Sequence, residues 1–385
     1  MRAHFLASGL PDSWRRKINQ QADLKGKVQT VLGLIEPDAM GVTLPHEHLF
    51  IDMSGFFIEP SDDDKELAYQ TISLENLSWV RSHRMSNLHN LQPFEEEEVI
   101  RETLLFKNAG GSTIVEQTPI NMARDPVKMM NVARRTGLNI IMGTAYYRET
   151  QVIWNSSRAG GWVAEKLDNY PSTYIDTVTE ENLTQTFVRD IMDGDCGVRA
   201  GFIGELGCSW PLTENERKIL RAATVAQRQT GALITIHPGF HEDSPLEIIK
   251  VLSDAGADIS HMVMSHMSIS VGSHRTRCKI AETGCYLEWD LFGWGGEYPQ
   301  QPTSIDIPSD QGRIRQIIEL IEEGYLNQIL ISHDICNRIR LACFGGSGYA
   351  HILQNIVPIM YQKGMTEEQI YMIMVENPKR AFTFV

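Results

Sequence analysis

The most constraining feature of the sequence is a regular alternation of short apolar runs with amphipathic helical segments. Eight runs rich in β-forming residues recur along the chain, at 41–48, 112–118, 139–147, 201–207, 232–239, 261–266, 285–293 and 328–334. Several of the helical segments between them open with Asp, Thr or Ser and close with Gly, as helix caps do. Strands that alternate with helices pair in parallel, and near-continuous apolar strands are covered on both faces. Eight such units predict a (β/α)8 TIM barrel.

An open doubly wound sheet is the alternative fold, but no glycine-rich phosphate-binding turn follows the first run. We expect residues 27–385 to form one barrel domain, because barrels of this type often take about 250 residues or more as a single unit. Residues 27–42, ahead of the first strand, resemble an antiparallel β-hairpin that plugs the bottom of the barrel. Residues 1–26 are polar and aperiodic, and we expect them to form an N-terminal extension.

Long connections follow three of the predicted strands, at 49–94, 148–180 and 294–309. Loops that follow the strands of such a barrel lie at its catalytic mouth, where they shape the choice of substrate.

The charge balance and the cysteine pattern exclude several classes of protein. Acidic residues outnumber basic ones by 49 to 35, a net charge of −14, and no block of Lys and Arg stands out, so we expect no nucleic acid partner. No apolar stretch is long enough to cross a bilayer, and no signal-peptide core follows the N-terminus, so we expect a cytoplasmic protein without a membrane partner. The 6 cysteines are scattered without a CxxC pair, which indicates reduced thiols.

Ionisable residues stand at the ends of five of the predicted strands. They are His46 and His48 on strand one, Glu205 on strand four, His237 on strand five, His266 on strand six and Asp334 on strand eight. Residues two apart in a strand point to the same side, so both histidines of strand one can face the barrel mouth. A buried charge or imidazole costs a few kcal/mol unless it is paired or bound to metal. Groups of this kind that converge on one mouth therefore predict a divalent metal centre.

Four imidazoles and two carboxylates suit zinc, with manganese, cobalt or iron as replacements. These ligands exceed what one tetrahedral ion uses, so we expect two ions that share Glu205 and a hydroxide. We assign His46, His48 and Asp334 to the buried ion, and His237 and His266 to the outer ion.

Other carboxylates near the same strand ends have two interpretations. Glu116, Glu288 and Asp290 either orient the ligand imidazoles or pair with nearby arginines. We expect His333 to point to the opposite face of its strand and to be structural.

The order of the ligands and several longer stretches resemble the phosphotriesterase family of the amidohydrolase superfamily. The stretches "GELGCSWPLTENERK", "ADISHMVMSH", "GCYLEWDLFG", "SHDICNRIRL" and "GGSGYAHILQNIVP" are closest to its phosphotriesterase-related branch, and the likeness runs from about residue 26 to the C-terminus. In the best-known members a carboxylated lysine bridges the two metals, whereas Glu205 stands there in this chain, as in the phosphotriesterase-related branch. The resemblance also implies that Tyr147 lines the substrate pocket.

Two positions depart from the family pattern. Lactonases of the family carry a D-R-[YF]-G sequence after strand seven, but this chain has Asp290-Leu291-Phe292-Gly293, which argues against acyl-homoserine lactones as substrates. Ile269 stands where an Asp usually follows the histidine of strand six, so a proton relay through that position is not expected.

These observations predict a hydrolase in which a metal-bridging hydroxide cleaves an acyl bond of a small molecule. The resemblance implies an amide, such as an N-acyl amino acid or an acyl-taurine, or an ester or lactone. We expect Asp334 to take the proton of the hydroxide and to pass it to the leaving group. Arg338 and Arg340 follow strand eight, and Arg338 in particular is a candidate to hold a carboxylate or sulfonate of the substrate.

Three alternative functions stay open from the sequence. One is organophosphate hydrolysis on the same site. Another is a non-catalytic barrel that keeps its metals for folding or for sensing a ligand, and the third is a mononuclear deaminase, which would have no use for a bridging Glu205. Barrels of this family often pair, so a homodimer is compatible with the resemblance.

Overall fold

A parallel β-barrel forms the centre of the molecule. The structure is a computed structural model that describes residues 24–147, 174–295 and 306–385. An eight-stranded parallel sheet runs in the order β10-β9-β8-β7-β6-β5-β4-β3. Its strands are β3 (Thr43–Glu47), β4 (Thr113–Glu116), β5 (Asn139–Thr144), β6 (Phe202–Gly207), β7 (Ile234–His237), β8 (Met262–Met264), β9 (Tyr286–Trp289) and β10 (Ile329–Ile331). Each strand lies within one of the predicted runs, so the eight predicted strands are confirmed.

Hydrogen bonds between β3 and the segment after β10 close the sheet. The amide of Asp334 donates to the carbonyl of His46 at 3.2 Å, and the amide of His46 donates to the Ser332 hydroxyl at 3.1 Å. The predicted (β/α)8 barrel is therefore confirmed, and its closure lies beside two of the predicted metal ligands.

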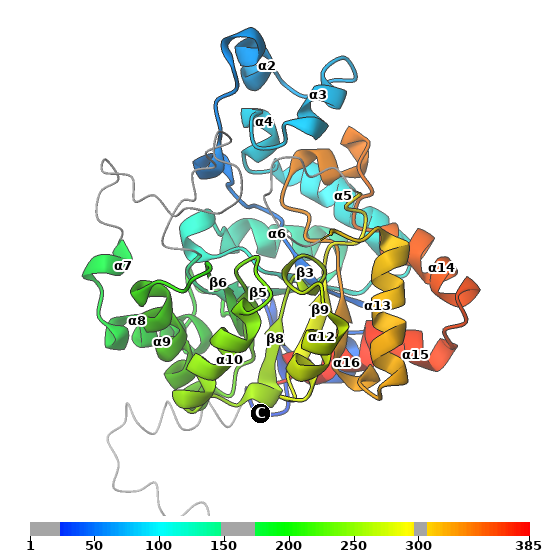
Figure 1. Cartoon of the computed structure of the whole chain (residues 1–385). Coiled ribbons are helices and arrows are strands. Elements are labelled where there is room, and N and C mark those ends of the chain that lie inside the picture. The colour runs from blue at the N-terminus through cyan, green and yellow to red at the C-terminus, as the bar shows by residue number, and fades with distance from the viewer. Residues whose placement is uncertain (1–23, 148–173, 296–305) are drawn as a thin grey trace, which may run out of the picture.

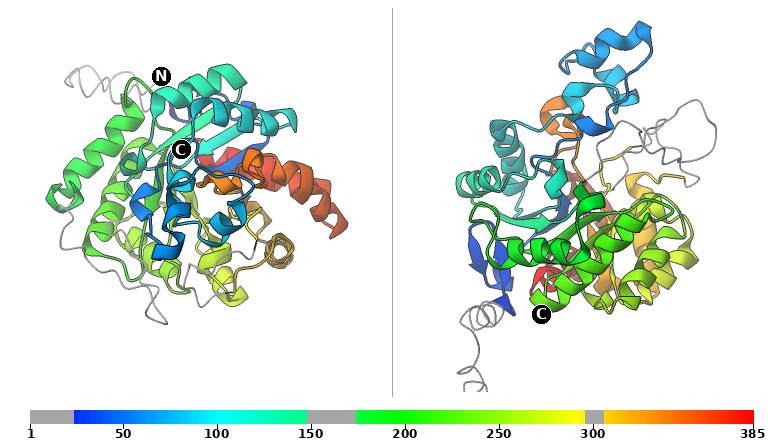
Figure 2. Two further views of the ribbon diagram at one scale, coloured as in Figure 1. Left: turned by 90° about the horizontal axis from the view of Figure 1, so that it is seen from above. Right: turned by 90° about the vertical axis from the view of Figure 1, so that its left-hand side faces the viewer.

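Helices surround the barrel (Figures 1 and 2). Those of eight residues or more are α5 (Glu96–Asn108), α6 (Pro126–Thr136), α8 (Glu180–Met192), α9 (Glu214–Thr230), α10 (Ser244–Asp254), α12 (His274–Ala281) and α13 (Asp310–Glu322). The predicted caps explain where they begin and end. The Asp125 side chain accepts from the amide of Lys128 at the start of α6, Thr213 and Glu216 form a capping box on α9, and Gly231 ends α9 at a φ of 74°.

Shorter helices lie in the connections and near the C-terminus. They are α2 (Lys65–Tyr69), α3 (Leu77–Ser82), α4 (Leu88–Leu91), α7 (Tyr174–Thr177), α11 (Met267–Ser270), α14 (Val357–Gln362), α15 (Glu367–Tyr371) and α16 (Asn377–Phe382). The connection 49–94 contains α2, α3 and α4, which stand beyond the end of the barrel opposite the C-terminus (Figures 1 and 2). Because this connection follows β3, that end is the barrel mouth.

Some expectations fall wholly or largely outside the described residues. Residues 1–23 of the expected N-terminal extension are outside them, and so is most of the connections 148–180 and 294–309. Within the described ranges, no helix is long and apolar enough to cross a membrane.

Three predicted strands extend too far at their carboxyl ends. β3 ends at Glu47, β8 at Met264 and β10 at Ile331, so His48, His266, His333 and Asp334 follow their strands instead of ending them. The backbone φ angles of His266 and Asp334 are 57° and 53°, in the left-handed region that residues with a side chain rarely adopt. The chain leaves the β-sheet at these two turns, and the turns place the side chains of His266 and Asp334 at the barrel mouth.

The bottom of the barrel is closed by apolar side chains from both ends of the chain. The predicted hairpin is confirmed as β1 (Val28–Thr30) paired antiparallel with β2 (Gly33–Ile35). An apolar cluster joins residues from this hairpin region to the barrel strands and to α16: Val28, Met40, Val115, Ile141, Phe202, Leu233, Val263, Tyr286, Leu330, Ala381 and Phe382. The barrel is therefore filled with apolar side chains below and leaves its polar groups at the mouth.

We predict that Phe202→Ala lowers the free energy of unfolding by about 3–5 kcal/mol, because it leaves a cavity inside the barrel. Phe202 is fully buried and lies edge-on to Phe382, with ring centroids 5.4 Å apart. Guanidinium denaturation would show the loss as a lower midpoint. Leu74→Ala, at a side chain that is 93% exposed, is the control and should leave the midpoint unchanged. An equal midpoint for both variants would contradict the role of this cluster.

Candidate metal centre

The structure brings all of the sequence-predicted metal ligands together at the barrel mouth, and all are buried. Among the described residues, three groups of possible metal ligands have their atoms within 4.8 Å of one another; one joins His46 and His266 to Asp290, and the other two consist of predicted ligands alone. Of these two, one is His46, His48 and Asp334, and the other is Glu205, His237 and His266. The first of these contains the residues expected to bind the buried ion, and the second joins Glu205 to the two histidines expected to bind the outer ion.

The carboxylate–imidazole spacings within each group suit a small divalent ion, whereas Nδ1 of His237 and Nε2 of His266 lie closer together, at 2.6 Å. In the first group, Nε2 of His48 lies 3.1 Å from Oδ1 of Asp334, and Nε2 of His46 lies 3.8 Å from the same oxygen. In the second group, Oε2 of Glu205 lies 3.3 Å from Nδ1 of His237 and 3.4 Å from Nε2 of His266. A tetrahedral zinc ion holds nitrogen and oxygen ligands at about 2.0–2.2 Å, which puts them roughly 3.3–3.5 Å apart.

The carboxylate of Glu205 faces both groups. Its Oε1 lies 3.6 Å from Nε2 of His48, and its Oε2 lies 3.5 Å from Nε2 of His46. The same Oε2 contacts the two histidines of the second group. One carboxylate between two sets of ligands has the position that a ligand shared by two ions requires.

Two buried atoms of this cluster have no hydrogen-bond partner among the described residues: Nε2 of His46 and Oε2 of Glu205. A buried polar atom without a partner costs about 1–3 kcal/mol. A cation between the two groups would be a partner for both atoms. Imidazole nitrogens and carboxylate oxygens are also the donor set that zinc and similar ions prefer, so the residues fit divalent metal.

The electrostatics of the cluster favour positive charge. Burial lowers the pKa of His46, but the carboxylates of Glu205 and Glu288 outweigh burial and raise it to about 10. Burial likewise lowers the pKa of His266, and the contact with Asp290 raises it well above its usual value. Burial raises the pKa of Glu205, but the neighbouring imidazoles, His46 foremost, hold it well below its usual range. The carboxylates of the mouth therefore stabilise any cation bound among them.

Two carboxylates from the end of β9 orient ligand imidazoles. Nδ1 of His46 donates to Glu288 at 3.0 Å, and Nδ1 of His266 donates to Asp290 at 2.9 Å. The amide of His266 also donates to Asp290, at 2.8 Å. With Nδ1 protonated, the lone pair of each ring lies on Nε2 and faces the metal cluster. Of the two interpretations given to these acids, the structure shows the orienting contacts.

Glu116 acts on a ligand through a residue that the sequence did not reveal. Nδ1 of His48 lies 3.0 Å from the hydroxyl of Thr118, and that hydroxyl donates to Glu116 at 2.5 Å. Thr118 follows Glu116 by two positions, and this spacing is the only sequence signal for the pair.

Glu47, the acid between His46 and His48, has a role that sequence reasoning also missed. Its carboxylate accepts four hydrogen bonds from the segment after β10, and the donors are the Ser332 hydroxyl, the His333 amide, the His333 Nδ1 and the Ile335 amide, at 2.7–3.1 Å. Nε2 of His333 in turn accepts from the amide of Ile352. Glu47 and His333 therefore hold the turn that carries Asp334, and the expected structural role of His333 agrees with these contacts.

Apolar side chains surround the ligands at the mouth. We call this group the mouth cluster, and its residues are Ile51, Met122, Tyr147, Ile269, Leu291, Trp294 and Cys336, with Met53, Phe56, Phe240 and Ile307 packed against them. The Tyr147 hydroxyl lies 3.2 Å from Nε2 of His237. Tyr147, expected to line the substrate pocket, thus lies beside the second group of ligands.

Arg338, the candidate to hold an anionic group of the substrate, has its guanidinium in contact with other parts of the protein. Its guanidinium donates to the carbonyls of His89, Gln92 and Pro93 and pairs with Glu98 at 3.2 Å. These contacts hold the connection 49–94 against the barrel. They also use the guanidinium N–H groups that would have to bind a substrate anion. Arg340, two residues later, instead has its Cζ 4.1 Å from the centre of the Trp294 ring.

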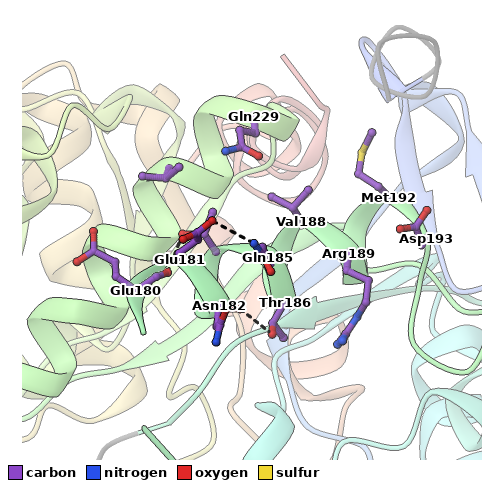
Figure 3. Close-up of a pocket in the computed structure, with 12 residues that line it drawn as sticks. Glu180, Glu181, Asn182, Gln185, Thr186, Val188, Arg189, Met192, Asp193 and Gln229 are labelled. Atoms are coloured by element: carbon purple, nitrogen blue, oxygen red, sulfur yellow. Dashed lines mark hydrogen bonds between the residues drawn. The ribbon is translucent and has the colours of Figure 1, made fainter. Parts of the chain in front are cut away.

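A separate hollow of about 890 Å³ lies along α8 and α9, on the outside of the barrel (Figure 3). Its lining includes Glu181, Gln185 and Arg189 of α8 and Gln229 of α9, and no metal ligand. It is not the metal centre.

Comparison with known proteins agrees with this centre. Residues 26–382 match the sequence model of the phosphotriesterase family. The human N-acetyltaurine hydrolase is 40% identical over 366 residues, which are 94% of this chain and 99% of that protein. The N-acetyltaurine hydrolase of Dictyostelium discoideum is 39% identical and covers 94% and 98%. A resiniferatoxin-binding protein from Rhodobacter sphaeroides superposes with a TM-score of 0.84 at 31% identity, covering 93% and 95% of the two chains.

We predict that Glu288→Gln weakens zinc binding by about 10–100-fold, because His46 loses the acceptor that fixes its ring. A zinc titration against a competing chelator would measure the change. Glu214→Gln, at a carboxylate with a side chain that is 91% exposed, is the matched control and should bind zinc as the unchanged protein does. Equal affinity for the two variants would refute the orienting role of Glu288.

We also predict that the metal-free protein releases protons when it takes up zinc at pH 7. With a pKa of about 10, His46 is protonated at that pH, and an imidazole must lose its ring proton to bind a metal. Lower pH strengthens this competition, so zinc affinity should fall as the pH falls. Titration calorimetry in two buffers of different ionisation enthalpy would count the protons, and equal heats in both buffers would contradict the prediction.

Proposed function

The chain belongs to the phosphotriesterase family, and from that membership we propose that it hydrolyses the acyl–nitrogen bond of a small N-acyl amide with two zinc ions in its metal centre. The family consists of binuclear metal-dependent hydrolases, and the chain is a metal-dependent hydrolase that acts on amide or ester bonds of small molecules. The observation that carries the proposal is the pair of ligand groups that meet at Glu205. N-acetyltaurine hydrolases that are 39–40% identical over nearly the whole chain favour an amide over an ester.

Each ligand has a proposed role. His46, His48 and Asp334 hold the buried ion, His237 and His266 hold the outer ion, and Glu205 contacts both. When bound, the ions lower the pKa of a water molecule toward neutrality and polarise the acyl carbonyl. Zinc is proposed, with manganese, cobalt or iron as replacements, because four of the ligands are imidazoles, which suit borderline ions such as zinc better than hard ions such as magnesium.

Asp334 is the proposed general base and acid. Its carboxylate belongs to the first ligand group, 3.1 Å from Nε2 of His48, and lies at the mouth side of the barrel. As the water oxygen forms a bond with the acyl carbon, Asp334 takes the water's proton. It then passes that proton to the amine nitrogen as the carbon–nitrogen bond breaks, so the products are a carboxylic acid and an amine.

Tyr147 is the proposed wall of the substrate site beside the outer ion. Its hydroxyl contacts His237, and its ring lies edge-on to Phe56, with centroids 6.1 Å apart. A small acyl group would pack against these rings. The Arg338 contacts described above leave it out of this site.

We extend the proposal to the chain as a whole. Residues 27–385 form one catalytic domain, since the metal ligands come from strands spread over that range. A cytoplasmic location is supported by the cysteines, all of which are free thiols. The net charge of −14 supports the absence of a nucleic acid partner. A homodimer is proposed from the resemblance alone.

We predict that the zinc-loaded protein hydrolyses N-acetyltaurine and that Asp334→Asn lowers kcat by about 10²–10⁴-fold, because the proton then has no carrier. The assay panel would hold N-acetyltaurine, N-acetyl amino acids, simple esters, lactones and a phosphotriester. Asp254→Asn, at a surface carboxylate that is 66% exposed, is the matched control. A protein that holds two ions and turns over nothing on the panel would support the non-catalytic barrel. One ion per chain would support a mononuclear enzyme.

A further inference from the structure

An ion pair at the start of α13 lies behind the barrel mouth, outside the metal centre. Asp310 is the first residue of α13, and Arg313 follows one turn later, with Nη1 2.8 Å from Oδ1 of Asp310. Arg313 is fully buried, and the Asp310 side chain is 22% exposed. Burial raises the pKa of Asp310, but the contacts with His351 and Arg313 outweigh burial and hold the pKa below its usual value. The Asp310 carboxylate is therefore charged at neutral pH.

This ion pair holds the turn after β9. The amide of Gly293 donates to Oδ1 of Asp310 at 3.0 Å, and Nη1 of Arg313 donates to the carbonyl of Trp294 at 3.0 Å. Gly293 has a φ of 83°, and a Cβ added there would lie 2.8 Å from the Ser347 side chain. The turn therefore packs directly against the segment after β10.

The ion pair also contacts the two connections whose backbone is left-handed at a predicted metal ligand. Nε2 of His351, in the segment after β10, donates to Oδ2 of Asp310 at 2.9 Å. Nε of Arg313 donates to the Ser268 hydroxyl at 3.4 Å, and Ser268 lies in α11, two residues after His266. Two side chains of α13 thus join three βα connections of the mouth.

Trp294 extends these contacts to the proposed proton carrier. Its Nε1 donates to the carbonyl of His333 at 2.6 Å, and His333 directly precedes Asp334. Asp334 has a φ of 53°, and a strained conformation of this kind persists only where the surrounding contacts enforce it. The hydrogen bond from Trp294 is one of those contacts, and the ion pair of α13 holds Trp294.

We propose that Asp310 and Arg313 are positioning residues for the reaction, which act through Trp294 to hold Asp334 where it passes its proton to the leaving amine. The inference rests on the proposed amide hydrolysis and assigns two further residues to its second half. Neither residue belongs to the ligand groups, so we expect their loss to change the transfer of the proton more than the binding of zinc.

The leaving group separates this role from a general support of the mouth. Attack of the water oxygen on the acyl carbon is common to amides and esters. An amine leaves only when its nitrogen takes up a proton as the carbon–nitrogen bond breaks, whereas 4-nitrophenolate leaves without one. A displaced Asp334 should therefore slow the cleavage of an amide far more than that of a nitrophenyl ester.

The test measures kcat and KM of the zinc-loaded protein on two substrates with the same acyl group, N-acetyltaurine and 4-nitrophenyl acetate. Asp310→Asn keeps the size of the side chain and loses the charge that binds Arg313. We expect this variant to lower kcat on the amide by about 10–100-fold and kcat on the ester by less than about threefold, with little change in KM. Asp38→Asn, at a side chain that is 90% exposed, is the matched control and should behave as the unchanged protein.

Two further variants test the path of the effect. Trp294→Phe removes the N–H that donates to His333 and should reproduce the selective loss on the amide. Asp310→Glu keeps the charge and should retain more amide hydrolysis than Asp310→Asn. Zinc content and melting temperature show whether each variant is folded and loaded, and Trp294→Phe decides the question if Asp310→Asn does not fold.

An equal loss on both substrates would mean that the ion pair only supports the mouth, and it would overturn the proposal. Unchanged kcat on the amide in Asp310→Asn or Trp294→Phe would overturn it as well. If the unchanged protein does not cleave the ester, 4-nitroacetanilide, an amide of a weakly basic amine, takes its place. A failure of the proposed function is distinct from these outcomes, because the unchanged protein would then cleave neither amide.

Discussion

The hydrogen bonds of Glu47 to the segment after β10 are the contact on which the rest of the metal centre depends. A barrel sheet must join its first strand to its last, and here the buried Glu47 carboxylate accepts four hydrogen bonds from that segment, in addition to the two that His46 makes with it. β3 and the residue that follows it supply His46 and His48, and the segment held by Glu47 supplies Asp334. The contacts that close the barrel therefore also hold the first ligand group together. Weakening them would move His46 and His48 away from Asp334, the proposed proton carrier.

The bottom of the barrel interior contributes mainly to the stability of the fold, and the mouth carries the candidate metal ligands. Apolar residues such as Phe202 and Phe382 fill the bottom and supply the burial that holds the fold. The mouth instead concentrates buried carboxylates, with Glu288 and Asp290 behind the imidazoles. Such a concentration of negative charge is unfavourable without cations, so the bound ions both stabilise the mouth and provide its reactivity. The left-handed turns at His266 and Asp334 fit this division, since strained backbone concentrates where function requires a side chain in one position.

The strands, and the convergence of the candidate ligands on one mouth, can be predicted from the sequence for a physical reason. Parallel strands of a barrel put their carboxyl ends at one mouth, so an ionisable residue after each apolar run can be placed without knowledge of any other contact. Glu47, Thr118 and Asp310 could not be assigned in this way. Their roles depend on which remote segment packs against them, and a single sequence carries no signal for such pairs. Arg338 shows the same limit, because only the three-dimensional path of the connection 49–94 brings the carbonyls of His89, Gln92 and Pro93 to its guanidinium.

Both departures from the family pattern lie in the mouth cluster. Leu291 stands where lactonases of the family carry an arginine, and Ile269 stands where an aspartate is usual, and both side chains are buried in this cluster. The positions that hold charge in those relatives are apolar here. The guanidinium groups of Arg84 and Arg340, on connections after β3 and β10, lie instead against the Trp294 ring of this cluster. The candidate ligands can therefore keep their places at the strand ends while the side chains around them change from charged to apolar, because the ligands and their surroundings come from different parts of each βα connection.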